Sequence, residues 1–110
     1  MAYVGHYSAE APDREAVDGM QGAVLLEFGT DWCGHCQAAQ AGIGQALAGH
    51  DTVRHLKVED GRGRRLGRSF GVKLWPTLVF LLDGVERARL VRPTTAAPVR
   101  EALGSIDPGP

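Results

Sequence analysis

The feature that most constrains this chain is the segment WCGHC at residues 32–36, which contains both of its cysteines. Two cysteines at this spacing form a disulfide only where the backbone turns sharply, as it does at the start of a helix. Backbone N–H groups and the helix dipole stabilise a thiolate at a helix N-terminus. Cys33 is therefore the candidate nucleophile and Cys36 the candidate resolving thiol. His35, when protonated, would stabilise the same thiolate with a second positive charge.

Two other accounts of the cysteine pair stay open. A CxxC pair is also half of a structural zinc site, but such a site needs four ligands. The chain has no third cysteine, and its other histidines stand singly at His6, His50 and His55. The second account is a pair of reduced core cysteines that happen to be close in sequence. Redox chemistry explains the spacing best, so the sequence predicts no metal site and no bound cofactor.

Composition limits the classes of partner. At 110 residues, with 44% hydrophobic residues and a formal net charge of −1, the chain has the size of one domain with one ordinary core. The near-zero net charge predicts neither a nucleic-acid partner nor an anionic membrane. No apolar run approaches the roughly 20 residues that span a bilayer. The one basic cluster is predicted to be an exposed loop or short helix, because no aromatic residues interleave with it to stack on bases. That cluster is Arg62, Arg64, Arg65 and Arg68.

The N-terminus predicts the compartment. Residues 1–6 show neither the basic start nor the apolar stretch of a signal peptide. We therefore expect a cytoplasmic protein, while a mature secreted or periplasmic form stays open. Structural disulfides are rare in the cytoplasm, so a CxxC pair there is predicted to be catalytic.

Hydrophobic periodicity and turn residues predict alternating strands and helices. The predicted strands cover residues 2–7, 23–28, 53–58, 78–82 and 85–91, and the predicted helices cover residues 13–20, 34–48 and 94–103. Asp83 and Gly84 are a two-residue turn signal, so the last two strands are expected to be antiparallel. Gly42 and Gly44 weaken the middle helix and suggest a kink or a close approach of helix and sheet. Residues 105–110 are expected to be a loose tail.

Glu27 is the one charged residue inside the apolar run of residues 23–28. Continuous apolarity is typical of a strand covered on both faces, as in the middle of a parallel sheet. An unpartnered carboxylate there is destabilised, so we expect the pKa of Glu27 to be raised. A strand ending near Gly29 would place Glu27 beneath the dithiol, where it could take the proton from Cys36. The other account, a glutamate at a strand end with its carboxylate in water, stays open.

Four segments resemble those of the thioredoxin family at matching separations. They are residues 24–28 (VLLEF), 32–36 (WCGHC), 70–77 (FGVKLWPT) and 83–84 (DG). The CGHC form is similar to that of protein disulfide isomerase domains. The resemblance implies an α/β thioredoxin fold, in which a central mixed sheet of four to five strands is flanked by helices on both faces. Residues 1–110 are then a single thioredoxin-like domain, with its core at about residues 10–104 and the loose tail outside it.

The resemblance also implies a thiol–disulfide oxidoreductase that acts on protein disulfides. The thiolate of Cys33 attacks a substrate disulfide, Cys36 resolves the mixed disulfide, and Glu27 shuttles the proton. A second participant, an unidentified dithiol reductant or oxidant, would restore the starting redox state. We expect the protein to act as a monomer. Two rivals stay open: an interaction or chaperone module that keeps the motif without turnover, and a metal-binding dithiol protein.

The substrate site follows from the same resemblance. Pro76 in cis would face the dithiol and leave the backbone of Trp75 free to pair with an extended substrate segment. Trp32 and Gly34 are expected in the same substrate-contact surface. Without the resemblance, a trans proline at a strand start and a purely structural tryptophan are the ordinary accounts.

Several positions near the site depart from the family's pattern. Most thioredoxins have proline where His35 stands, so we expect a more oxidising reduction potential. Gly29 stands where an aromatic residue is common, which removes one wall of the site. Leu74 stands where a small residue is common, which narrows the peptide groove. The lysine often found near the buried acid is matched by either His55 or Lys57.

Overall fold

The computed structural model describes residues 2–107 of the 110-residue chain. A four-stranded sheet in the order β2-β1-β3-β4 forms its centre. The strands are β1 (Ala23–Gly29), β2 (Arg54–Glu59), β3 (Thr77–Leu82) and β4 (Val85–Val91). β1 is parallel to β2, whereas β3 is antiparallel to both β1 and β4. The sheet is therefore mixed, as expected.

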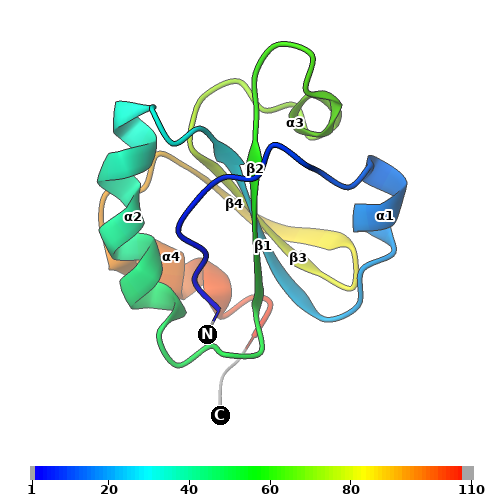
Figure 1. Cartoon of the computed structure of the whole chain (residues 1–110). Helices are drawn as coiled ribbons and strands as arrows, with labels where there is room; N and C mark the ends of the chain where they lie inside the picture. Colours follow the sequence, from blue (N-terminus) through cyan, green and yellow to red (C-terminus); the bar gives the residue numbers. More distant parts are fainter. Residues whose placement is uncertain (1, 108–110) are drawn as a thin grey trace.

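Helices cover both faces of the sheet (Figure 1). They are α1 (Arg14–Asp18), α2 (Gly34–Leu47), α3 (Arg65–Ser69) and α4 (Ala96–Leu103). α2 and α4 lie on one face, and α1 and α3 lie on the other. Side chains alternate along β1, so Leu25 packs with Ile43 in one core while Phe28 packs with Leu66 in the other. This architecture confirms the predicted fold class.

Turn and cap residues form the local structures that their types predict. Asp13 caps α1 by accepting a hydrogen bond from the Ala16 backbone N–H at 2.8 Å, and Gly19 ends that helix. Asp83 and Gly84 adopt φ values of 50° and 79° between β3 and β4, as a tight hairpin turn requires. The predicted helix start and the predicted hairpin are both confirmed.

Gly42 allows a close approach, but between two helices and not between helix and sheet. A Cβ atom on Gly42 would lie 2.8 Å from the backbone carbon of Thr95, the residue that precedes α4. A Cβ atom on Gly44 would lie 3.8 Å from the ring of Tyr3, which is an ordinary contact. Only the first glycine is therefore required by packing.

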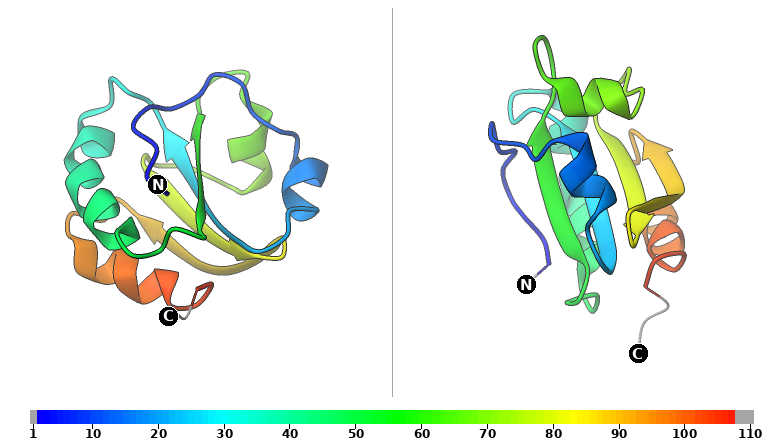
Figure 2. Two further views of the ribbon diagram at one scale, coloured as in Figure 1. Left: turned by 60° about the horizontal axis from the view of Figure 1, so that its bottom comes forward. Right: turned by 90° about the vertical axis from the view of Figure 1, so that its right-hand side faces the viewer.

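The N-terminal segment does not form the strand expected at residues 2–7. The segment runs beside β2 toward α1 (Figure 2). It pairs with β2 through one parallel bridge, between Ser8 and Val58. Its hydrogen bonds are Ser8 N–H to Lys57 O and Glu59 N–H to Ser8 O, both at 2.9 Å. The segment nevertheless buries Tyr7, and this placement matters for the site.

The C-terminal prediction needs a correction. Ile106 is buried in the core beneath α2 and α4, and Asp107 Oδ2 lies 2.8 Å from His50 Nδ1. Apolar burial holds residues 105–107 against the domain, so the expectation of a loose tail is wrong for them. The rest of the predicted tail, residues 108–110, lies outside the described residues. Among residues 2–107, no helix has the length and apolarity needed to cross a membrane.

Candidate active site

The two cysteines lie where β1 passes into α2. Cys33 is the N-cap residue of α2, and its Sγ accepts a hydrogen bond from the Cys36 backbone N–H at 3.3 Å. Cys33 is partly exposed, whereas Cys36 is buried in the first turn of the helix. The structure therefore presents one sulfur to solvent and covers the other, as a nucleophile and a resolving thiol require.

The two thiols differ in acidity. Burial raises the pKa of Cys33, but hydrogen bonds from Cys36 and from the backbone N–H of His35 outweigh that effect. The positive charge of Arg92 acts in the same direction, so the pKa of Cys33 lies below its ordinary value. Burial and a hydrogen bond with Cys33 raise the pKa of Cys36 to about 11. The predicted acidity of Cys33 is thus reproduced, although Arg92, which the sequence did not reveal, supplies a charge beside it. The His35 side chain is exposed.

Glu27 is fully buried beneath α2, so the account with its carboxylate in water is wrong. Its Oε1 lies 2.8 Å from His55 Nε2. Its Oε2 accepts hydrogen bonds from the Tyr7 hydroxyl and, at 2.9 Å, from Gln40 Nε2. His55 Nδ1 accepts a hydrogen bond from the Val4 backbone N–H at 2.9 Å, so the proton of a neutral ring is on Nε2 and points at the carboxylate.

These donors reverse the expected direction of the pKa shift of Glu27. Burial raises the pKa of Glu27, as the sequence predicts. The hydrogen bond and charge of His55, with hydrogen bonds from Tyr7 and Gln40, lower it by more, so its pKa lies below the ordinary value. The prediction of a raised pKa is wrong because it assumed a carboxylate without partners.

Lys57 joins the same buried cluster from β2. The register pairs Glu27 with Lys57, and Lys57 Nζ donates to Gln40 Oε1 at 2.8 Å and to Gly5 O at 3.1 Å. Burial lowers the pKa of Lys57, and the charge of Glu27 opposes that effect. The ambiguity between His55 and Lys57 is therefore resolved: His55 contacts the acid directly, and Lys57 contacts it through Gln40.

The loop before β3 forms another part of the site, next to Trp32. The Trp75–Pro76 peptide bond is cis, as the resemblance implied for Pro76. Trp75 is held by its indole Nε1, which donates to Asp60 Oδ2 at 2.8 Å, and by its carbonyl oxygen, which accepts from Arg92 Nε at 2.8 Å. The ring of Trp32 meets the ring of Trp75 edge-on, with centroids 5.8 Å apart. Since Trp32 is 75% exposed, the two indoles form an accessible aromatic surface at the site.

Tyr7 occupies the wall that Gly29 leaves open. A Cβ atom on Gly29 would lie 2.5 Å from Cys36 Sγ and 2.8 Å from the Tyr7 hydroxyl oxygen. The missing side chain thus creates the space in which Tyr7 meets the site. Leu74, expected to narrow the peptide groove, is half exposed.

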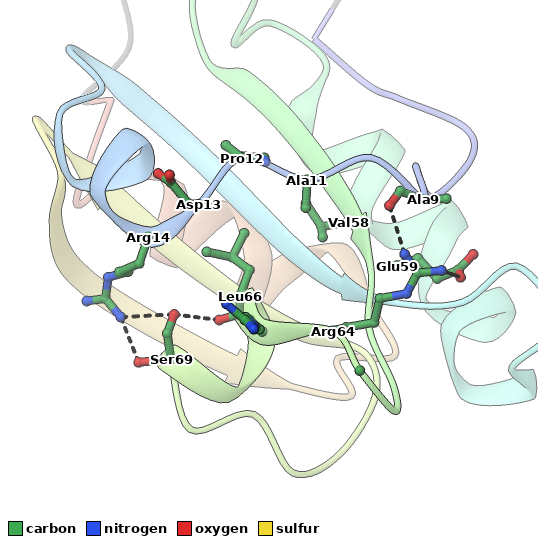
Figure 3. A pocket seen from close by; sticks show the side chains of 12 residues that line it. Ala9, Ala11, Pro12, Asp13, Arg14, Val58, Glu59, Arg64, Leu66 and Ser69 are labelled. Atoms are coloured by element: carbon green, nitrogen blue, oxygen red, sulfur yellow. Dashed lines mark hydrogen bonds and ion pairs between the residues drawn. The ribbon is translucent and has the colours of Figure 1, made fainter.

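A separate groove of about 450 Å³ lies on the α1–α3 side of the sheet (Figure 3). Two of its arginines have partners: Arg64 donates to Glu59 at 2.6 Å and to Ala9 O at 2.9 Å, and Arg14 donates to Ser69 O at 2.7 Å. The basic cluster of Arg62, Arg64, Arg65 and Arg68 lies on the short helix α3 and the turn before it, as predicted. Across residues 2–107, no group of three histidine, cysteine or acidic side chains is arranged to hold a metal ion.

Comparisons with known proteins agree with this geometry. Residues 7–104 match the protein family Thioredoxin. The chain is similar to thioredoxin 2 from Pseudomonas aeruginosa PAO1, solved in its reduced form, with 60% identity, 93% of this chain and 94% of that chain covered, and a TM-score of 0.83. It is 42% identical over 66 residues to protein disulfide-isomerase A2 of Homo sapiens, a match that covers 56% of this chain but only 13% of the relative. It is 26% identical over 85 residues to thioredoxin Asp f 28 of Aspergillus fumigatus, covering 77% and 79% of the two chains. The chain therefore belongs to the thioredoxin family.

Proposed function

We propose that this chain is a thiol–disulfide oxidoreductase that exchanges a Cys33–Cys36 dithiol or disulfide with protein substrates. The observation that carries the proposal is the division of acidity between the sulfurs: the accessible Cys33 has a lowered pKa, and the buried Cys36 has a raised one. The thiolate is the nucleophile in disulfide exchange, so Cys33 reacts first. Cys36 stays protonated, and therefore unreactive, until the mixed disulfide has formed.

The reduction of a substrate then proceeds in two balanced steps. The Cys33 thiolate attacks one sulfur of the substrate disulfide, and the other sulfur leaves with the electron pair. Cys36 next loses its proton toward Glu27 and attacks Cys33, which releases the second substrate sulfur as a thiolate. The protein ends as the disulfide, and the substrate ends as the dithiol. The reverse sequence oxidises a substrate.

The substrate is proposed to lie across the indole surface and the cis proline. Trp75 O already accepts from Arg92, so its backbone N–H is the group that we expect an extended substrate segment to use. Trp32, Gly34 and Pro76 would flank that segment. The thioredoxin and protein disulfide-isomerase relatives support protein substrates and a separate redox partner. We also propose that the protein acts as a monomer in the cytoplasm.

Insulin reduction with dithiothreitol tests the function. We expect the wild-type chain to accelerate precipitation of the insulin B chain and Cys33→Ser to abolish that acceleration. In a separate incubation with insulin and no dithiothreitol, Cys36→Ser should trap a mixed disulfide with the substrate, visible as an added mass that a reductant then removes. If the wild-type chain binds a substrate without turning it over and Cys36→Ser traps no mixed disulfide, the chain is an interaction module and the proposal is wrong.

A further inference from the structure

We propose that the hydroxyl of Tyr7 carries the proton between Cys36 and Glu27, so that Tyr7 is a catalytic residue of the exchange reaction. The proposal rests on the proposed function and concerns its second step, the attack of Cys36. Tyr7 lies 29 positions before Cys36 in the chain, outside every motif by which the sequence indicates the site.

The position of Tyr7 is set by contacts on three sides. Its backbone N–H donates to Asp31 Oδ1 at 3.1 Å. Lys57 Nζ lies 4.3 Å from the centre of its ring, which is the distance of a cation–π contact. Its hydroxyl donates to Glu27 Oε2, and the side chain as a whole is buried. The phenol is therefore held in place before any substrate arrives.

The same hydroxyl reaches the resolving sulfur. A single atom added at the Cβ position of Gly29 would collide with both Cys36 Sγ and the Tyr7 hydroxyl oxygen, so the two groups face each other across that glycine. A hydrogen bond with Tyr7 is among the influences that lower the pKa of Cys36. The absence of a side chain at Gly29 is what permits this approach.

The other neighbours of Glu27 do not offer this route. His55 donates to Oε1, the carboxylate oxygen that Tyr7 does not use. Gln40 donates to Oε2 and also to the backbone oxygen of Cys36, not to its sulfur. Of the three donors to the carboxylate, Tyr7 is the one whose polar atom also lies against the space at Gly29 that Cys36 Sγ borders. A hydroxyl group can accept one proton while it donates another, which an amide N–H cannot do.

The proton balance of the relay is simple. As Cys36 attacks the mixed disulfide, its proton moves to the Tyr7 oxygen and the Tyr7 proton moves to Glu27 Oε2. The tyrosine ends neutral, and Glu27 ends as the neutral acid. Burial and the neighbouring charge of Glu27 raise the pKa of Tyr7, so the relay has no free phenolate stage. Mixed-disulfide formation removes the thiolate of Cys33, which is one of the groups that raise the pKa of Cys36.

The disulfide reagent DTNB separates the two steps in a stopped-flow experiment. Attack by Cys33 releases a first coloured thionitrobenzoate, and attack by Cys36 on the resulting mixed disulfide releases a second. In Tyr7→Phe we expect the second release to slow by on the order of 100-fold, the lower range for loss of a general acid–base group. The first release should stay within about twofold of wild type, which also shows that the variant is folded.

Tyr3→Phe is the matched control. It removes the other phenol of the chain, which donates to Gln40 Oε1 at 2.8 Å and not to Glu27. Both releases should keep wild-type rates in this variant. If Tyr3→Phe slows the second release as much as Tyr7→Phe does, the effect belongs to the hydrogen-bond cluster as a whole and the relay is wrong.

The pH profile and a double variant complete the test. The titratable groups around the phenol are Glu27 and Cys36 at its hydroxyl, Asp31 at its backbone, Lys57 at its ring, and His55 on the far oxygen of Glu27. With the relay, wild-type resolution should depend weakly on pH near neutrality, whereas in Tyr7→Phe it should rise in proportion to hydroxide. Because the relay is a series, Tyr7→Phe with Glu27→Gln should be no slower than the slower single variant.

Other outcomes overturn the relay or the function separately. If the second release keeps its wild-type rate in Tyr7→Phe but is slow in Glu27→Gln, the proton reaches Glu27 by another path. Multiplicative effects in the double variant would show that the two residues act independently and would also refute the relay. Loss of the first release in the wild-type chain would instead refute the proposed function.

Discussion

Glu27 Oε1 lies 2.8 Å from His55 Nε2, and both side chains are fully removed from solvent. This contact joins the two parallel strands β1 and β2 beneath the dithiol. It keeps a carboxylate ionised in the core, because His55 donates a hydrogen bond that the surrounding apolar side chains do not supply.

Removing that donor should destabilise the protein. We expect His55→Leu to lower the free energy of unfolding by about 1–3 kcal/mol at pH 7, because a buried acceptor loses its partner. His55→Gln is the matched control, since an amide at the same reach can still donate to Glu27. Urea denaturation of both variants measures the effect, and equal stability of His55→Leu and wild type would contradict it.

The same contact sets the pH dependence of stability. The pKa of Glu27 in the folded protein lies below its ordinary value of 4.5. Ionised Glu27 therefore stabilises the fold at pH values above 4.5, and this contribution is lost as the pH falls through the lower, folded-state pKa. The difference between wild type and His55→Leu should shrink over that acidic range. If the difference in unfolding free energy stays constant or grows on acidification, Glu27 is not ionised in the folded protein and the prediction is wrong.

The acidity of Cys33 should depend on Arg92. The φ of Arg92 is 55°, so Arg92→Gly removes the charge without adding backbone strain. We expect the midpoint of the alkylation rate against pH to lie below the ~8.5 of a free thiol in wild type and to move upward in the variant. Measurements are made in a Cys36→Ser background so that only Cys33 reacts. Arg87→Gly, at an exposed site on β4, the strand that ends just before Arg92, should leave the midpoint unchanged.

Gly29 should not tolerate even one added carbon. Gly29→Ala would place a methyl group 2.5 Å from Cys36 Sγ, and we expect a loss of about 1–3 kcal/mol in unfolding free energy from overpacking. Gly5→Ala, where no atom lies within 4 Å of the added carbon, is the control. Thermal and urea unfolding compare the two variants. If Gly29→Ala is as stable as Gly5→Ala, Cys36 and Tyr7 move aside at little cost and the prediction is wrong.

The two glycines of α2 should respond in opposite directions. Gly42→Ala brings a methyl group to 2.8 Å from the Thr95 backbone and should destabilise the protein by about 1–3 kcal/mol. Gly44→Ala meets only the Tyr3 ring at 3.8 Å and should stabilise it by up to about 1 kcal/mol, because alanine is the better helix former. The same sign of change in both variants would show that packing against α4 does not decide the effect.

The sequence predicted the fold well because its signals are local. The apolar run of β1, the Asp83–Gly84 turn and the Asp13 cap each act within a few residues, and the structure reproduces each of them. Gln40 was missed although a signal existed: it lies four residues after Cys36, and residues at that spacing share one face of a helix. Tyr7 and Arg92 carry no such signal.

Cysteine spacing, hydrophobic periodicity and turn residues determined by themselves the succession of strands and helices, the antiparallel hairpin at the end of the sheet and a dithiol at the start of a helix, and the resemblance to the thioredoxin family added the mixed sheet. Those features are set by backbone geometry over one or two turns of chain. Only the tertiary structure decided which donors surround Glu27, which charge lies near Cys33 and which residue stands above Gly29. These contacts join residues 13 or more positions apart, such as Glu27 and Gln40 or Tyr7 and Glu27. Their formation depends on how whole strands and helices pack, which no short stretch of sequence specifies.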